Sequence, residues 1–200
     1  MDTVAIKQVW ERLHKAKAAL DAMTSSRTLG QIEVGWSDFL TAASTIFSKL
    51  ERGSKGHSKT EPWFGRIKNE RRTDPLLSYV HHARNADEHG IAPITDKRNG
   101  YLAIKGDVHI EHLSIDGRGN IQLGRVTGLN SARPPEIIFE PARIELLPVL
   151  DDRFGDTFDV PTSHMGKPLE NPSAIIVAGL AYVYLEKIVR EASALVKDQK

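Results

Sequence analysis

The densest group of reactive side chains in this sequence lies in the segment DPLLSYVHHARNADEHG, residues 74–90. It holds three histidines together with an arginine, an asparagine and carboxylates. An imidazole can give or take a proton near neutral pH, and a guanidinium can hold two phosphate oxygens while it keeps its charge. These residue types are therefore suited to acid–base chemistry on a phosphate ester.

A helix must position these side chains. Asp74 followed by Pro75 is a strong helix-start signal, with the aspartate as the cap and the proline in the first turn. The pattern predicts a helix from Pro75 to about His89, and Gly90 can take the left-handed conformation that closes a helix.

Two sets of side chains on this helix are spaced four residues apart. His81, Asn85 and His89 form one stripe, while Arg84 and Glu88 form another pair. Positions five apart on an ideal helix point about 140° away from each other, so Arg84 and His89 are not expected to share a face. His89 must swing inward where the helix ends, or act across a dimer axis.

The run from Arg84 to His89, Arg-Asn-Ala-Asp-Glu-His, resembles the Arg-x4-6-His signature of the HEPN superfamily, in which a polar residue, commonly Asn, follows the arginine. This resemblance implies a helical bundle, a homodimer and metal-independent ribonuclease activity in toxin–antitoxin, phage-defence or RNA-processing systems. It also implies that Arg84 and His89 are catalytic, with Asn85 beside them, that no cofactor is needed, and that an antitoxin or other protein is a partner. The same spacing occurs from Arg52 to His57, in a glycine-containing loop with no helical setting.

RNA supplies its own nucleophile, so such an enzyme needs a group that accepts the proton of the 2′-hydroxyl, a group that protonates the leaving 5′-oxygen, and positive charge on the phosphate. The products are 2′,3′-cyclic phosphate and 5′-hydroxyl ends. Residues 52–72 carry seven cations against two carboxylates, which favours binding of a polyanion such as RNA. The residues expected to bind the substrate are Arg66, Lys68, Arg71, Arg72, His81 and Trp63.

Other parts of the chain predict the frame around this helix. Apolar residues at helical spacing predict helices from Thr3 to Met23 and from about Ile32 to Leu50, and a last helix follows Asn171-Pro172-Ser173. Between the helices, short apolar runs and the turn DGRGN (116–120) predict a sheet of three to five strands. We expect one domain, 1–200: a mainly α, HEPN-like bundle of four or five helices (1–90 and 171–200) with a β-rich insertion and an acidic loop (100–170), α+β overall.

Composition excludes several classes of function. The chain has 200 residues, a net charge of +1 and no cysteine, so disulfide scaffolds, thiolate metal sites and cysteine nucleophiles are ruled out. No secretory signal or run of about 20 apolar residues is found, so we expect a cytoplasmic protein with no membrane partner.

Roles other than catalysis and RNA binding remain open for the same residues. Arg84 and Glu88 can form a simple surface ion pair, and Trp63 can belong to the core. Metal ligation by His81, Asn85 and His89 is a further alternative, although no His-Glu-x-x-His pattern occurs and we expect no metal. At the level of function, the alternative to an enzyme is a non-catalytic binding or dimerisation module that recognises a protein or nucleic acid.

Overall fold

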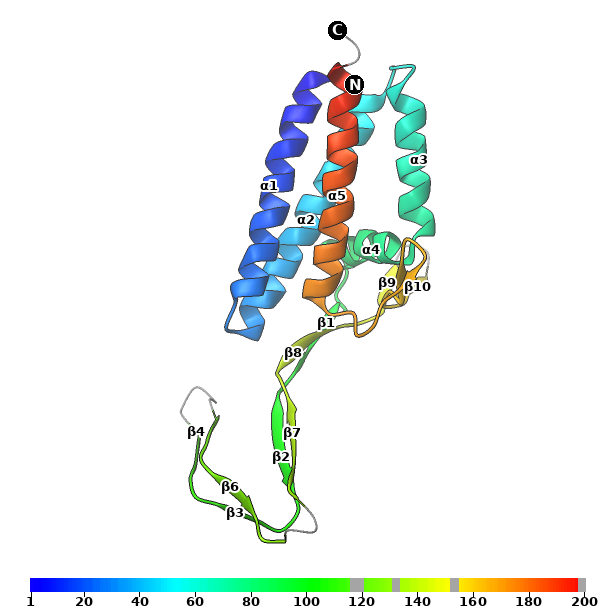
Figure 1. Ribbon diagram of the computed structural model, residues 1–200. Helices are drawn as coiled ribbons and strands as arrows, with labels where there is room; N and C mark the ends of the chain where they lie inside the picture. Colours follow the sequence, from blue (N-terminus) through cyan, green and yellow to red (C-terminus); the bar gives the residue numbers. More distant parts are fainter. Residues whose placement is uncertain (116–120, 131–133, 152–154, 198–200) are drawn as a thin grey trace. The chain divides into compact units, whose positions relative to one another are not determined.

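The computed structural model describes residues 1–115, 121–130, 134–151 and 155–197. Five helices make up most of it, and Figure 1 shows them in sequence colours. Their bounds are α1 Thr3–Ser25, α2 Leu29–Ser54, α3 Thr60–Thr73, α4 Pro75–His89 and α5 Ala174–Lys197. None of the helices in the described part of the chain is both long enough and apolar enough to cross a membrane.

Side-chain caps fix where α1 and α2 begin. The carboxylate of Asp2 accepts a hydrogen bond from the backbone N–H of Val4 at 2.7 Å, and the hydroxyl of Thr28 accepts one from Gln31 at 3.3 Å. These bonds satisfy N–H groups that have no partner within the helix. Because Thr28 caps α2 in this way, the short polar turn before it ends α1 and starts a new helix.

The core lies between the helices. Figure 1 shows α1, α2, α3 and α5 running side by side, with α4 lying across them, and α5 contacts each of the other four helices. The aliphatic and aromatic faces of all five helices are buried, and the largest fully buried side chains include Trp36, Phe39, Leu40, Tyr79 and Ile188. The prediction that the last helix lies within a bundle is therefore confirmed, although Val183 on its outer face remains 65% exposed.

Two compact units divide the chain. The first consists of residues 1–97 and 144–200 and contains all five helices, while the second consists of residues 98–143. The strands of the second unit are β2 Tyr101–Lys105, β3 Val108–Ile110, β4 Leu113–Ile115, β5 Ile121–Leu123, β6 Val126–Gly128 and β7 Glu136–Glu140. They form the antiparallel pairs β2–β7, β3–β6 and β4–β5.

The prediction of one small sheet is wrong, because the described strands occur only as two-stranded pairs. The pairing across the expected hairpin is confirmed, since Leu113 is opposite Leu123, while the DGRGN turn itself lies outside the described residues. The predicted acidic loop also contains short strands, which belong to the helical unit. The remaining strands are β1 Thr95–Arg98, β8 Arg143–Leu146, β9 Val149–Asp151, β10 Asp156–Phe158, β11 Ser163–His164 and β12 Lys167–Pro168.

Candidate functional site

Helix α4 begins at the residue that the sequence predicts, because Asp74 caps it. The Asp74 carboxylate accepts hydrogen bonds from the backbone N–H groups of Leu77 at 3.0 Å and Met165 at 2.6 Å, and lies 3.0 Å from Nδ1 of His164. Burial acts to raise the pKa of Asp74, but the hydrogen bonds from Met165, His164 and Leu77 outweigh it and hold the pKa below its ordinary value. One carboxylate thus fixes both the start of α4 and the β11 segment.

Helix α4 ends before Gly90, but not for the reason expected. Gly90 has φ −83° and ψ 163°, so its backbone is extended and the prediction of a left-handed cap is wrong. A Cβ atom at this position would lie 2.6 Å from the carbonyl oxygen of Ala86, to which the Gly90 N–H also donates. Glycine is therefore required by the close approach of the backbone to the last turn.

The last two turns of α4 bring the candidate catalytic residues to one carboxylate. A terminal guanidinium nitrogen of Arg84 forms an ion pair with Oε2 of Glu88, and Nε2 of His89 lies 3.9 Å from the same oxygen. The sequence predicts that Arg84 and His89 do not share a face of an ideal helix. Glu88 lies between them on the helix surface, and its carboxylate is approached by both side chains.

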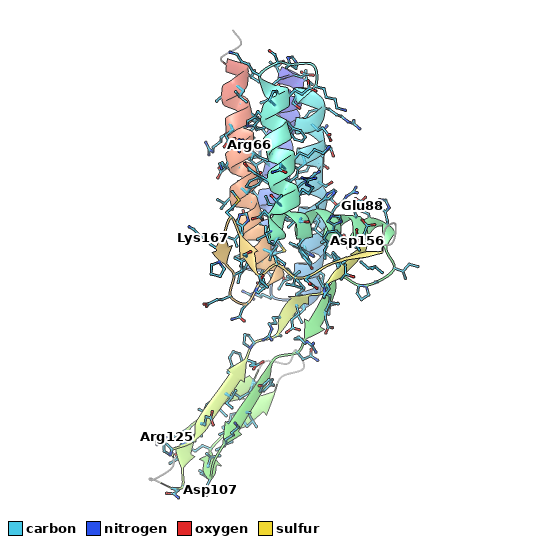
Figure 2. The ribbon with its side chains drawn as sticks, turned by 90° about the vertical axis from the view of Figure 1, so that its right-hand side faces the viewer. Arg66, Glu88, Asp107, Arg125, Asp156 and Lys167 are labelled. Carbon is cyan, nitrogen blue, oxygen red and sulfur yellow. The ribbon has the colours of Figure 1, made fainter. Side chains whose placement is uncertain are left out.

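The groups around this carboxylate differ in exposure. The side chain of His89 is 74% exposed, whereas that of Arg84 is 26% exposed. Arg84 also donates to Oδ1 of Asn85 at 3.3 Å, and its Nε is buried with no hydrogen-bond partner in the described part of the chain. Arg84 is thus held by its neighbours on α4, and the imidazole of His89 is open to a ligand. Figure 2 shows Glu88 near the end of α4.

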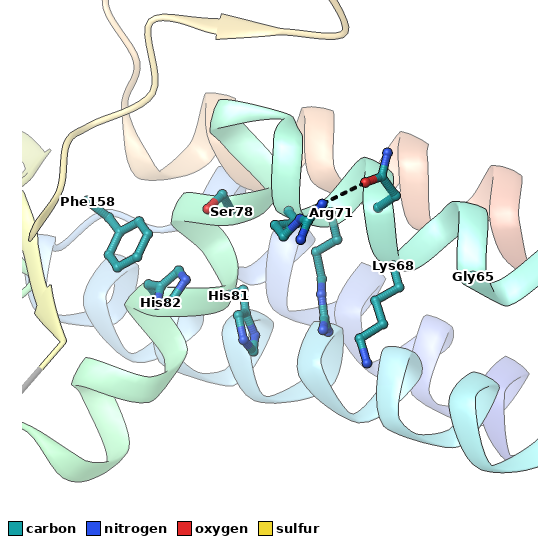
Figure 3. Close-up of a pocket in the computed structure, with 9 residues that line it drawn as sticks. Gly65, Lys68, Arg71, Ser78, His81, His82 and Phe158 are labelled. Carbon is teal, nitrogen blue, oxygen red and sulfur yellow. Dashed lines mark hydrogen bonds between the residues drawn. The ribbon is translucent and has the colours of Figure 1, made fainter. Parts of the chain in front are cut away.

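Four of the six residues expected to bind substrate meet in one pocket of about 550 Å³ between α3, α4 and β10. The lining residues are Gly65, Lys68, Asn69, Arg71, Arg72, Ser78, His81, His82 and Phe158. Figure 3 shows the side chains of Lys68, Arg71 and His81 extending to the same side of the two helices. The turn at Asp74 produces this arrangement, because it places the end of α3 against the first turns of α4.

The pKa values of both histidines that line the pocket are lowered. Burial, followed by the positive charge of Arg71, lowers the pKa of His81 to about 4. Burial also lowers the pKa of His82, against the opposing effect of the Asp151 carboxylate. The His82 ring stacks on Phe158 with centroids 3.4 Å apart, and its Nδ1 is 3.6 Å from an Asp151 oxygen.

Arg66 and Trp63, which the sequence placed in the substrate site, do not line this pocket. Arg66 forms ion pairs with Glu70 and, at 2.7 Å, with Glu191 of α5, and Trp63 donates from Nε1 to the same Glu191 oxygen at 3.0 Å. Both residues join α3 to α5, and the interpretation of Trp63 as part of the packed interior fits its half-buried position against the core.

Sequence reasoning missed other members of the pocket and its frame. Phe158 stacks on a residue 76 positions earlier, and His164 contacts Asp74 from 90 positions away. No local pattern around either residue indicates such a contact. Among the described residues, no three His, Asp or Glu side chains are grouped closely enough to hold a metal ion.

Comparisons of the chain with models of known protein families, with curated proteins and with solved structures give no match. The function must therefore be inferred from the chemistry of the α4 residues and the pocket.

Proposed function

We propose that this protein is a metal-independent, HEPN-type endoribonuclease whose site lies at the C-terminal end of α4. One observation carries the proposal: Arg84 and His89 both approach the same oxygen of Glu88. A group that binds phosphate and a group that transfers protons are therefore adjacent to one negative charge. A phosphate that replaces the Glu88 carboxylate would lie beside both groups.

The proposed reaction uses these two groups in different roles. His89 accepts the proton of the RNA 2′-hydroxyl, whose oxygen attacks the neighbouring phosphorus, and the bond from phosphorus to the 5′-oxygen breaks. Arg84 binds the phosphate oxygens on which charge increases in the transition state. The leaving 5′-oxygen takes a proton from a separate acid, so that the products are a 2′,3′-cyclic phosphate and a 5′-hydroxyl.

A second copy of the chain is our candidate for that acid. Each chain presents one exposed imidazole at this site, and a two-fold axis beside α4 would supply a second His89 from the same sequence position. In such a homodimer one imidazole acts as the base and the other as the acid.

The test is cleavage of a long unstructured RNA in EDTA by the wild type, His89→Ala and His57→Ala. His57 is the matched control, because it completes the other Arg-x4-His spacing but lies between α2 and α3. We expect cyclic phosphate ends from the wild type and from His57→Ala, and a loss of about 10²–10⁴-fold in His89→Ala. Full activity of His89→Ala, or an inactive wild type, would refute the proposal.

The non-catalytic binding module is a second candidate, favoured by the ion pair that occupies Arg84. It predicts RNA or protein binding without cleavage. In that case His89→Ala and the wild type would bind equally and neither would cut RNA.

A further inference from the structure

The pocket between α3, α4 and β10 carries positive charge that its own lining does not neutralise. Lys68, Arg71 and Arg72 line it, and none of the described lining residues is acidic. Two carboxylates outside the lining approach it: Glu51 is 3.6 Å from Lys68, and Asp151 is 3.6 Å from His82. The three cations come from one helix, α3, within five residues.

Arg71 is the most constrained of these cations. Its guanidinium lies over the ring of Phe47, 4.8 Å from the centroid, and is half-buried. Within the described residues it has no carboxylate within 4 Å, so burial lowers its pKa against the more distant pull of Glu51. A half-buried guanidinium with no carboxylate partner attracts an anion more strongly than a fully solvated one does.

The other lining residues supply hydrogen bonds and an apolar wall. Arg72 donates to Oδ1 of Asn69, another lining residue, at 3.2 Å. His81 is neutral, so it can donate one N–H without adding a charge, and Ser78 offers a hydroxyl. The stacked rings of His82 and Phe158 close the opposite end.

We propose that this pocket binds a phosphate monoester, either on a small molecule or at the phosphorylated 5′ end of an RNA. Two arginines and a lysine match a group that carries two negative charges, and guanidinium groups match the geometry of its oxygens. The volume of about 550 Å³ falls within the range of about 300–1,000 Å³ typical of small-molecule sites, so there is room for the group that carries the phosphate. This site goes beyond the proposed cleavage and does not depend on it.

Equilibrium binding to the wild-type chain tests the proposal. The probes are inorganic phosphate, ribose 5-phosphate, and a short 2′-O-methyl RNA with either a 5′-phosphate or a 5′-hydroxyl. The methylated RNA lacks the attacking hydroxyl, so it cannot be cut by the proposed reaction, and failure of the cleavage proposal leaves this measurement intact. Arg72→Gln is the main variant because Arg72 is exposed, and Arg71→Gln is the second. Arg27→Gln, an exposed arginine between α1 and α2, is the matched control.

We expect a 5′-phosphate to bind at least tenfold more tightly than the 5′-hydroxyl, and each pocket variant to remove about tenfold or more of that affinity while Arg27→Gln does not. If ribose 5-phosphate binds as tightly as the 5′-phosphorylated RNA, the natural ligand is a small phosphate ester. If only the 5′-phosphorylated RNA binds, the ligand is an RNA end. Equal binding of the two RNAs together with no binding of ribose 5-phosphate, or equal losses in Arg72→Gln and Arg27→Gln, would overturn the proposal. The melting temperature of each variant shows that it is folded.

Discussion

Replacing Asp74 by alanine should destabilise the helical unit more than any ordinary loss of a helix cap. The substitution removes the acceptor for the Leu77 N–H, worth about 1 kcal/mol as a cap, and leaves the Met165 N–H and the His164 ring without their charged partner. Hydrogen bonds to charged groups contribute about 1.5–3 kcal/mol each and are not fully additive, so we expect a total of about 3–5 kcal/mol. For a chain of this size that corresponds to a fall in Tm of roughly 10–15 °C.

The assay is urea unfolding of the wild type and Asp74→Ala, followed by circular dichroism of the helices. Asp2→Ala is the control, because the exposed Asp2 side chain caps α1 by a hydrogen bond from Val4, and its loss should cost about 1 kcal/mol. Equal losses in the two variants would refute the reasoning that Asp74 joins α4 to the β11 segment.

The same carboxylate predicts a pH dependence. The pKa of Asp74 in the folded chain lies below its ordinary value of 3.8, so its charge stabilises the fold fully above that pH. This contribution is lost as the pH falls through the folded pKa. The difference in stability between the wild type and Asp74→Asn should therefore shrink below about pH 4, and a difference that stays constant down to pH 2 would contradict the assignment.

Two smaller predictions test the packing and one buried hydroxyl. Gly35→Ala places a Cβ 2.5 Å from Cγ of Met23 and should lower the free energy of unfolding by about 1–3 kcal/mol. Gly179→Ala in α5 places a Cβ with nothing within 4 Å and should raise the free energy of unfolding by about 0.5–1 kcal/mol. Urea unfolding of both variants separates the effect of close packing from that of helix propensity. Tyr184→Phe removes a hydroxyl that donates to Glu70 at 2.8 Å, and burial together with this bond raises the pKa of Tyr184. The substitution should lower the free energy of unfolding by about 1–2 kcal/mol. An unchanged urea midpoint would show that water replaces the bond.

The parts of the fold that the sequence predicts well are those set by local chemistry. Asp74 and Pro75 determine the start of α4 because the cap bonds to an N–H only three residues away. The predicted end at His89 agrees as well, but for Gly90 the usual left-handed conformation was the wrong reason. A glycine can be required by φ or by a close contact, and a single sequence does not distinguish the two.

The candidate site divides along the same line. The ion pair of Arg84 with Glu88 is local, four residues apart, and was anticipated as the bland alternative. The pairing of Arg66 and Trp63 with Glu191 spans more than 120 residues, and the stack of His82 on Phe158 depends on the course of the chain after the insertion. Such contacts depend on tertiary packing. The positive charge of residues 52–72 does not predict which carboxylates or rings these side chains meet in the folded chain.

The two proposed sites share one helix, and this makes their combination testable. On an ideal helix His89 lies about 80° from His81 and about 20° from His82, so the proposed base is on the side of α4 that lines the pocket, whereas Arg84 lies about 140° from His89. His81 and His89 are separated by about 12 Å along the axis, because each residue rises about 1.5 Å. A stacked strand rises about 3.4 Å per nucleotide, so an RNA whose phosphorylated end occupies the pocket would reach His89 after roughly three to four nucleotides.

If both sites act on one RNA, cuts should therefore concentrate at a fixed short distance from a 5′-phosphate, and removing that phosphate should disperse them. Sequencing the products of matched 5′-phosphate and 5′-hydroxyl substrates measures this directly. Identical cut positions on the two substrates would mean that the pocket and the catalytic residues act independently, since an end bound in the pocket fixes which phosphate lies beside His89.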